Sequence, residues 1–274
     1  MKTSVIITVY NRPEMLLACL RALELNTVLV DEVVVSDDGS DDANVQLMRK
    51  KFDDFKFPVR YVRQEHNGYR LAAARNNAIR SAQGEYLISV DCDILLLPDA
   101  VAMHLRNAKK GRFLAGNRAL LDENTTRRVL TQNVSERFLE ALWDEADKSH
   151  LAKTSLRFQR NLFFRRLGLA AAHKPKILGC HFSLFRGDIE RVNGFDENFA
   201  GWGLEDDDFA RRLYKAGLSS RSVILEARAL HLWHPSVDSH PQQITESPNW
   251  NYFKRVDVPA YCINGLGKSL PPQG

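Results

Sequence analysis

The sequence predicts an α/β protein built on a mostly parallel β-sheet with helices on both faces. Between residues 1 and 110, runs of β-branched and apolar residues alternate with segments in which apolar residues recur at helical spacing. This β-α-β-α order is typical of parallel sheets covered by helices. With 274 residues, of which 44% are hydrophobic, the chain is long enough to bury a sizeable core as one domain.

The chain opens on "SVIITVY" (4–10), which predicts the first strand. This apolar stretch is short and ends in a polar turn, so it fits a strand better than a secretory leader. Pro13 suits the first turn of the helix that follows, in which Leu16, Leu20 and Leu23 recur at helical spacing.

The next strand ends in an acidic turn. "EVVVSDDGSDD" (32–42) predicts this strand, with Ser40 or Asp41 as the N-cap of a second helix. Because ligands of such folds bind beyond the carboxyl ends of the strands, the polar strings "TVYN", "SDDGSDD" and "VDCD" predict a common site. The same alternation continues with strands at 59–62 and 85–93, a helix at 71–82 and a helix that opens at Pro98.

Residues 120–175 predict helices rich in basic side chains. Between Lys153 and Lys176 the chain has seven lysine or arginine residues and no acidic residue. One interpretation is a solvated helix face that packs on the sheet. The other is a contact of residues 153–176 with anionic lipid at the inner face of the membrane, or with an anionic acceptor.

The second half predicts two more strands and a tail. "ILGCHFSLFR" (177–186) and "SVILEARALHLW" (222–233) have the composition of strands, and five prolines from Pro241 onward indicate an extended tail. The expected parts are one domain at 1–235, with a nucleotide-binding half at 1–110, a helical basic insertion and an acceptor or catalytic half at 176–235, and a C-terminal tail at 236–274.

Composition limits the partners and the compartment. A net charge of only +4 gives no reason to expect a nucleic-acid partner. No apolar run approaches the roughly 18 residues of a membrane-spanning helix. The four cysteines are widely spaced without a CxxC pair, which favours free thiols in a reducing cytoplasm.

Two acidic strings at strand ends are candidates for a binding site. Asp91 and Asp93 in "VDCD" would lie on one side of a regular strand, where two carboxylates can hold a divalent cation together with phosphate oxygens. Alone, such a pair is more often a turn or capping motif. In "SDDGSDD", turn chemistry explains much of the pattern, but a carboxylate there could accept hydrogen bonds from a base N–H or a ribose hydroxyl.

"HLWH" places His231 and His234 three residues apart. In a continuing strand the two side chains would point to opposite faces, so we expect only one of them to join a common site. A histidine at a strand end can be structural. With a DxD string in the same chain, metal ligation is an equal alternative.

Four carboxylates in a row occupy 205–208. In a helix that begins there, Asp207 would pair with Arg211 and Asp208 with Arg212, each pair contributing roughly 0.2–0.5 kcal/mol. The first two acids have no cation at i+4. The helix dipole tolerates anions in the first turn, which explains their position but not the "GWG" before them.

The "GWG" string suggests a second role for these first two acids. Gly201 and Gly203 allow close backbone approach or movement, and Trp202 between them offers a flat apolar surface of the kind on which sugars stack. An aromatic side chain beside the unpaired Glu205 and Asp206 would form a site for sugar hydroxyls. This interpretation stands beside that of helix-stabilising acids.

Together, the strings "TVYNRP", "SDDGSDD", "AAARNNA", "VDCD" and "GFDENFAGWGLEDDDFARRL" resemble, in order and spacing, the family-2 glycosyltransferases with a GT-A fold. The last string is similar to the C-terminal motif shared by β-1,4-galactosyltransferases and chondroitin polymerase domains. The resemblance covers residues 3–235, and the ordered set is far more specific than any one string. It implies an inverting, Mn²⁺- or Mg²⁺-dependent enzyme that moves a sugar from a UDP-sugar to a saccharide or lipid-linked saccharide, as in bacterial surface polysaccharide synthesis.

The resemblance also implies roles for single residues. Asp91 would touch the ribose or the water shell of the metal. Asp93 would bind the metal together with one histidine, which is His231 by one family spacing and His234 by another; we favour His231. The residues that would contact the nucleotide are Thr8, Tyr10, Arg12, Asp38 (toward uridine) and Arg75.

The resemblance implies that Trp202 walls the acceptor or the donor sugar, as one of the residues that bind the nucleotide-sugar. On the acceptor side, it implies that Glu205 hydrogen-bonds acceptor hydroxyls and Asp206 deprotonates the attacking hydroxyl. Related retaining GalNAc-transferases carry asparagine at the position of Asp206, so the aspartate favours inversion. Two departures from the family pattern leave the donor sugar open. Leu204 replaces a common glycine, and His181 replaces a small or amide residue.

Two other functions are alternatives. A sugar-nucleotide pyrophosphorylase has a related fold but needs an N-terminal loop rich in glycine and lysine, which "TVYNRPEML" does not provide. A carbohydrate-binding protein without catalytic activity would bind glycans independently of UDP and of metal. Binding measurements with and without metal distinguish these possibilities.

Overall fold

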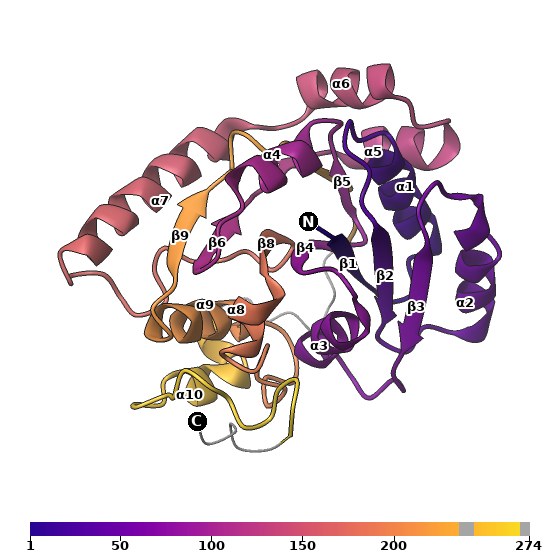
Figure 1. Cartoon of the computed structure of the whole chain (residues 1–274). Coiled ribbons are helices and arrows are strands. Elements are labelled where there is room, and N and C mark those ends of the chain that lie inside the picture. The colour runs from indigo at the N-terminus through magenta and orange to yellow at the C-terminus, as the bar shows by residue number, and fades with distance from the viewer. Residues whose placement is uncertain (236–243, 269–274) are drawn as a thin grey trace.

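The computed structural model describes residues 1–235 and 244–268 (Figure 1). A seven-stranded sheet occupies the centre of the molecule, and a three-stranded sheet accompanies it. The strands are β1 (Thr3–Val9), β2 (Glu32–Asp37), β3 (Val59–Arg63), β4 (Tyr86–Asp91), β5 (Ile94–Leu96), β6 (Arg112–Ala115), β7 (Ala119–Leu120), β8 (His181–Phe185), β9 (Ser219–Ser222) and β10 (Ala229–His231).

Helices surround the large sheet, as predicted. The α-helices are α1 (Pro13–Glu24), α2 (Asp42–Arg49), α3 (Leu71–Ser81), α4 (Ala100–Asn107), α5 (Glu123–Thr131), α6 (Glu136–Glu145), α7 (Ser149–Arg166), α8 (Arg186–Glu190), α9 (Glu205–Lys215) and α10 (Asn249–Phe253), with 3-10 turns η1 (Phe52–Asp54) and η2 (Ile244–Glu246). Helices α5 to α7 confirm the helical character predicted for the basic insertion. No helix in the described ranges combines the length and the apolar character needed to cross a bilayer.

The predicted mostly parallel sheet is confirmed. Its strand order is β3-β2-β1-β4-β8-β6-β9. The first four strands are parallel neighbours, β8 runs antiparallel between β4 and β6, and β9 pairs in parallel with β6. In the small sheet, β10 lies between β5 and β7.

Strand β1 shows how helices cover both faces of the large sheet. Val5, Ile7 and Val9 pack into one hydrophobic core with α1 and α2, whereas Ile6 packs into a second core with α3 and α9. Successive side chains of a strand point to opposite faces. One continuous apolar run therefore serves two cores, which explains why these strands lack the polar alternation of a half-exposed sheet.

The strand predicted over 222–233 is wrong as a single element. Strand β9 ends at Ser222, and a turn follows in which the N–H groups of Glu226 and Ala227 both donate to the carbonyl of Val223. The chain then enters β10, which pairs in the other sheet. The apolar run continues through the turn, in which Val223, Ile224 and Ala227 are buried, so hydrophobicity alone does not mark the break.

The C-terminal segment contains more structure than its prolines predict. Within its described part, α10 and the residues up to 268 fold back beside α8 and α9 (Figure 1). Asn193 donates from Nδ2 to the carbonyls of Cys262 and Gly267 over 2.7 and 2.6 Å. The domain boundary at residue 235 stays a prediction, and 236–243 and 269–274 lie outside the described residues.

Candidate active site

The carboxyl ends of the parallel strands bring the predicted strings together. The register between β1 and β4 places Thr8 beside Asp91, and Thr8 Oγ1 donates to Asp91 Oδ1 over 3.2 Å. The same register between β1 and β2 places Val9 beside Asp37. This is the edge of the sheet at which ligands bind in such folds.

Arg75 on α3 holds three carboxylates at this edge. Its Nη1 donates to Glu205 Oε1 over 3.1 Å and to Asp206 Oδ1 over 2.9 Å. Its Nη2 lies 3.4 Å from Asp91 Oδ1, and only 2% of the side chain is exposed. Within α9 the two acids lack a cation, as predicted, but α3 supplies one. One guanidinium among three carboxylates leaves an excess of negative charge in a buried place, and the pKa of Arg75 is raised despite its burial.

A backbone donor orients Asp206. Its Oδ2 accepts a hydrogen bond from the N–H of Gly179 over 2.7 Å, while Oδ1 is held by Arg75. A Cβ at position 179 would lie 2.3 Å from Asp206 Oδ1 and from Arg75 Nη2, so this close approach requires glycine. The side chain of Asp206 is 24% exposed, which leaves it accessible to a bound molecule.

Glu205 differs from Asp206 in its surroundings. Burial, together with the neighbouring Asp206, raises the pKa of Glu205 to about 8 despite the contact with Arg75. Its Oε2 is buried without a hydrogen-bond partner in the part of the chain that the structure describes. Because an unpaired buried polar atom is costly, this oxygen is suited to hydrogen-bond a hydroxyl of a ligand.

A second cluster consists of Asp93, His231 and His234. The Nε2 atom of His231 lies 3.8 Å from Asp93 Oδ1, and that of His234 lies 3.3 Å from Asp93 Oδ2. The expectation that only one histidine joins the site was wrong. Strand β10 ends at His231, so strand alternation does not reach His234.

The donor set of this cluster fits a divalent metal ion. One carboxylate oxygen and one nitrogen from each histidine lie within 4.8 Å of one another. Burial lowers the pKa of His231 to about 4, so its imidazole is neutral and can ligate near neutral pH. The hydrogen bond from His234 lowers the pKa of Asp93 despite burial, which keeps that carboxylate ionised. Arg12 Nη1 also donates to Asp93 Oδ2, over 2.8 Å.

The turn after β2 joins an aromatic stack beside β1. Asp38 Oδ2 accepts a hydrogen bond from the backbone N–H of Arg70 over 3.0 Å. The Tyr10 ring, 42% exposed, stacks on His66 with centroids 4.7 Å apart and planes 11° apart. His66 Nδ1 lies 3.3 Å from the carbonyl of Asp38 and so links the two. No motif of the sequence marks His66, because its place depends on the fold of the loop after β3.

The C-terminal segment fixes the Gly-Trp-Gly loop (201–203). Both glycines and Leu204 have positive φ, between +75° and +92°. Leu204 therefore keeps a backbone conformation that favours glycine. Asn249 Nδ2 donates to the carbonyls of the two glycines over 3.3 and 2.9 Å, and Ser247 Oγ donates to that of the tryptophan over 2.8 Å. No motif in the sequence identifies Asn249 or Ser247 as a contact of this loop.

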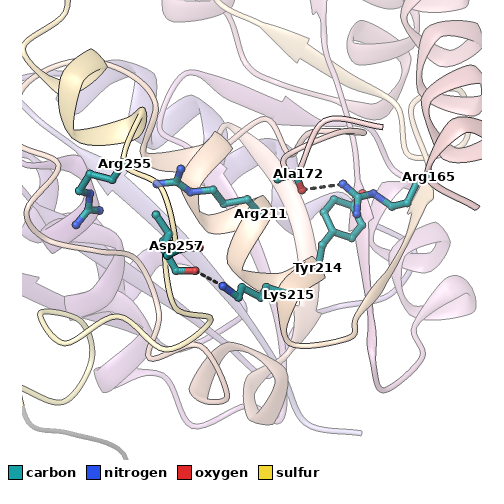
Figure 2. A pocket seen from close by; sticks show the side chains of 8 residues that line it. Arg165, Ala172, Arg211, Tyr214, Lys215, Arg255 and Asp257 are labelled. Carbon is teal, nitrogen blue, oxygen red and sulfur yellow. Dashed lines mark hydrogen bonds between the residues drawn. The ribbon is translucent and has the colours of Figure 1, made fainter. Parts of the chain in front are cut away.

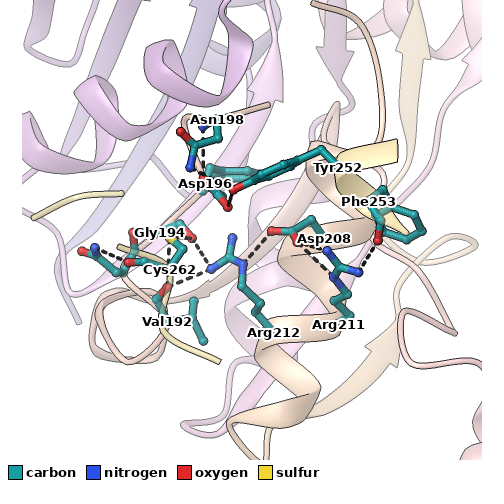
Figure 3. Close-up of polar contacts among 12 residues, drawn as sticks. Val192, Gly194, Asp196, Asn198, Asp208, Arg211, Arg212, Tyr252, Phe253 and Cys262 are labelled. Carbon is teal, nitrogen blue, oxygen red and sulfur yellow. Dashed lines mark hydrogen bonds and ion pairs between the residues drawn. The ribbon is translucent and has the colours of Figure 1, made fainter. Parts of the chain in front are cut away.

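The last two acids of 205–208 form ion pairs within the protein, and Figure 3 shows those of Asp208. Asp208 accepts from Arg211 and from Arg212, each over 2.6 Å, which confirms the predicted pair with Arg212. The predicted pair of Asp207 with Arg211 is wrong. Arg211 turns to Asp208 at i+3, and Asp207 lies 3.7 Å from Lys176 Nζ instead.

A cationic hollow of about 350 Å³ is a separate feature of the surface (Figure 2). Arg165 donates from Nη2 to two backbone carbonyls over 2.9 and 2.7 Å, and Lys215 Nζ donates to the carbonyl of Val258 over 2.8 Å. Arg165 therefore ties the loop after α7 to the end of α7, and Lys215 ties the C-terminal segment to the end of α9. The lining residues are Arg165, Ala172, Arg211, Tyr214, Lys215, Arg255, Asp257 and Val258.

His181 belongs to a buried chain of hydrogen bonds behind the site. Its Nδ1 lies 2.8 Å from the carbonyl of Asn117, and its Nε2 lies 2.8 Å from His104 Nε2. Since a carbonyl only accepts, His181 carries its proton on Nδ1, and His104 must donate to His181 Nε2. Ser183 then donates to His104 Nδ1 over 2.7 Å. Both ring nitrogens of His181 are thus engaged within the protein.

Comparison with known families gives two matches. The model described as "Glycosyl transferase family 2" matches residues 4–191, and the model described as "N-terminal domain of galactosyltransferase" matches residues 169–235. The first range contains Arg75, Asp91 and Asp93. The second contains the whole of α9 and both histidines of the metal cluster.

Two curated relatives and a solved structure show similarity over most of the chain. Chondroitin synthase of Escherichia coli is 30% identical over 80% of this chain. Validoxylamine A glucosyltransferase of Streptomyces hygroscopicus subsp. jinggangensis (strain 5008) is 32% identical over 78%. This chain spans only 33% and 52% of the length of these two proteins. The structure of GalNAc-T7 with UDP, GalNAc and Mn²⁺ shares the fold, with a TM-score of 0.58 at 15% identity over 85% of this chain and 44% of that one.

Proposed function

The chain belongs to glycosyl transferase family 2, and on that premise we propose that it is an inverting, metal-dependent glycosyltransferase. It moves a sugar from a UDP-sugar to a hydroxyl of a saccharide or lipid-linked saccharide. One observation carries the proposal. Arg75 gathers Asp91, Glu205 and Asp206 beside a cluster of one carboxylate and two imidazoles.

The nucleotide would bind along the ends of β1 and β2. The exposed Tyr10–His66 stack offers a flat surface, and Asp38 lies beside it with a carboxylate suited to a base N–H. Thr8 and Arg12 stand between this surface and the two clusters, since they contact Asp91 and Asp93 respectively. A donor placed this way would extend its diphosphate toward Asp93.

Asp93, His231 and His234 would hold Mn²⁺ or Mg²⁺. A divalent ion there would offset negative charge on the departing diphosphate as a Lewis acid. Oxygen and imidazole donors together suit Mn²⁺. Asp93 is ionised and His231 neutral near neutral pH, whereas the hydrogen bond to Asp93 raises the pKa of His234, so a metal ion would displace a proton from that imidazole. The structure of GalNAc-T7 with UDP, GalNAc and Mn²⁺, which shares this fold, supports a divalent ion in the proposed reaction.

Asp206 would act as the base. It would take the proton of the attacking hydroxyl while that oxygen bonds to the anomeric carbon and the bond to UDP breaks. Attack opposite the departing UDP inverts the anomeric centre. Arg75 and the Gly179 N–H hold the carboxylate in position, and protonated Glu205 can donate a hydrogen bond to an acceptor oxygen. Trp202 would form the wall against which a sugar packs.

A saccharide acceptor in bacterial polysaccharide synthesis is supported by the relatives, among which is a chondroitin synthase. The four cysteines of the chain are free thiols, which supports the predicted cytoplasmic location. The chain lacks the N-terminal loop rich in glycine and lysine that a sugar-nucleotide pyrophosphorylase needs, which disfavours that alternative.

Calorimetric titration with UDP tests this function. UDP should bind the wild-type protein in the presence of Mn²⁺, and binding should weaken sharply after addition of EDTA or in Asp93→Ala. The exposed Asp53 provides a control, since Asp53→Ala should leave UDP binding unchanged. Glycan binding that depends on neither UDP nor Mn²⁺ would instead favour the carbohydrate-binding alternative. A screen of UDP-sugars for Mn²⁺-dependent hydrolysis then identifies the donor.

A further inference from the structure

Helix α7 lies along the outer edge of the molecule (Figure 1). Several of its large apolar side chains are exposed. Such side chains normally face the core of a globular protein. In α7 and the residue directly after it, the exposed fractions are 72% for Leu156, 58% for Phe163, 39% for Phe164 and 55% for Leu167.

These apolar side chains share one face with three cations. At about 100° per residue, the seven residues fall within an arc of about 120°. We call this set the outer face of α7: Lys153, Leu156, Arg157, Arg160, Phe163, Phe164 and Leu167, all of them exposed.

The opposite face of α7 is attached to the protein. Leu151 and Phe158 are buried, and the guanidinium of Arg165 lies 3.6 Å from the centroid of the Tyr214 ring. Arg165 also binds the backbone of the loop that follows. The rotation of the helix about its axis is therefore fixed by these contacts, and the outer face points to solvent because the inner face is occupied.

The exposed apolar side chains argue against the first interpretation of this segment, in which α7 presents an ordinary solvated face. A solvated face is polar, whereas a contiguous apolar patch on a surface marks an interaction site. The charge on this patch is also one-sided. From Lys153 to Lys176 there are seven basic residues and no acidic one.

We propose that the outer face of α7 docks on the surface of an anionic lipid bilayer. Leucine and phenylalanine side chains enter the boundary between headgroups and acyl chains, as in amphipathic helices that lie in the membrane plane. The cations lie among the lipid phosphates, to which the anionic surface potential attracts them. A protein partner would need one patch that is both apolar and strongly acidic to match this face, whereas an anionic bilayer provides both properties at its surface.

This inference goes beyond sugar transfer and does not depend on it. If the proposed function also holds, docking would raise the local concentration of a lipid-linked acceptor near the active site. Transfer to a water-soluble acceptor would be unaffected by loss of docking. The two proposals can therefore fail separately.

Cosedimentation with vesicles tests the docking. The full chain should bind vesicles that contain phosphatidylglycerol and not vesicles of phosphatidylcholine alone. Phe163→Ser with Leu167→Ser should reduce binding to the anionic vesicles at least about tenfold, since two large apolar side chains no longer leave water on docking. Leu225→Ser is the matched control, because Leu225 is 59% exposed outside α7.

A charge variant completes the test. Arg157→Glu with Arg160→Glu should also abolish binding, and its thermal unfolding should match that of the wild type because both side chains are exposed. Absence of binding to anionic vesicles, or equal binding to neutral ones, would overturn the proposal. So would a wild-type dimer in light scattering that becomes monomeric in Phe163→Ser with Leu167→Ser, since the outer face would then be a protein interface.

Discussion

Arg75 and Asp206 form a 2.9 Å ion pair although 131 residues separate them in the chain. The pair joins α3, in the half predicted to bind the nucleotide, to the first turn of α9. Because Arg75 also contacts Asp91 at the end of β4, one buried guanidinium fixes the distance between the expected donor and acceptor sides of the site. The proposed catalytic geometry and the stability of the fold therefore depend on the same side chain.

Replacing Arg75 should destabilise the protein strongly. Arg75→Met leaves three carboxylates without their shared cation, and breaking a buried pair of this kind costs about 3–5 kcal/mol. Urea unfolding measures the loss. Arg127→Met is the control, because the Arg127 side chain is 70% exposed and its pair with Glu123 should contribute only about 0.5 kcal/mol. Equal losses in the two variants would show that Arg75 does not hold the cluster together.

Asp206→Asn should keep donor binding and lose transfer. The amide preserves the shape of the side chain but accepts no proton, so kcat should fall by about 10²–10⁴. UDP affinity in the presence of Mn²⁺ should stay within about twofold, because the proposed role of Asp206 is to take a proton during transfer and not to bind UDP. Asp207→Asn, one residue away and paired with Lys176, should keep its activity. Full transfer by Asp206→Asn would rule out this residue as the base.

Glu205 should make stability depend on pH. Its pKa is raised from 4.5 to about 8, so between these values the folded protein holds a proton that the unfolded chain releases. The free energy of unfolding therefore falls as pH rises through this window. Glu205→Gln mimics the protonated form and should remove that slope. Urea unfolding of both proteins near pH 5 and near pH 9 measures it, and parallel curves would contradict the raised pKa.

Both histidines should matter for metal affinity. His231→Ala and His234→Ala should each weaken Mn²⁺ binding at least about tenfold. Removing a residue that only hydrogen-bonds a metal ligand already costs about that much affinity, so removing a ligand should cost no less. Mn²⁺ titration in the presence of UDP, followed by electron paramagnetic resonance, measures this directly. His150→Ala on α7 is the control. A variant of either cluster histidine with unchanged affinity would remove that residue from the metal site.

Asn249→Ala should loosen the Gly-Trp-Gly loop. It removes two hydrogen bonds to glycine carbonyls from a residue that is 3% exposed, which should cost about 1–3 kcal/mol and weaken saccharide binding at Trp202. Tryptophan fluorescence during acceptor titration and urea unfolding give the two readouts. Asn251→Ala, an exposed change in the same helix, should alter neither. Unchanged acceptor affinity in Asn249→Ala would separate the loop from the acceptor site.

Local pattern was sufficient for the first half of the fold. Strands β1, β2 and β4 are buried on both faces, so each reads as a continuous apolar run, and the polar ends of β1, β2 and β4 mark one edge of the sheet. The break between β9 and β10 escaped the same reasoning. The residues of this turn are as apolar as those of a strand, and only pairing in a second sheet shows where the chain leaves the first.

The two predictions that failed at the site did so for a similar reason. His234 was assigned by strand alternation to the face away from His231, but the strand ends and the chain turns back toward Asp93. Asp207 was paired with Arg211 by helical spacing alone. Spacing lists the partners within reach, and the surrounding structure selects among them, here Asp208 for the arginine and Lys176 for the acid.

The sequence by itself determined the α/β class, the strings that form the site and the difference between the first and last pairs of acids at 205–208. Those features depend on spacing along one element, which the order of residues specifies. Only the tertiary structure decided that Arg75 neutralises Glu205 and Asp206, that the Gly179 N–H orients Asp206, and that the outer face of α7 is exposed. Contacts between elements far apart in the chain form only when the elements pack together. Residue type also does not show which backbone N–H will donate to a side chain or which helix face will stay exposed.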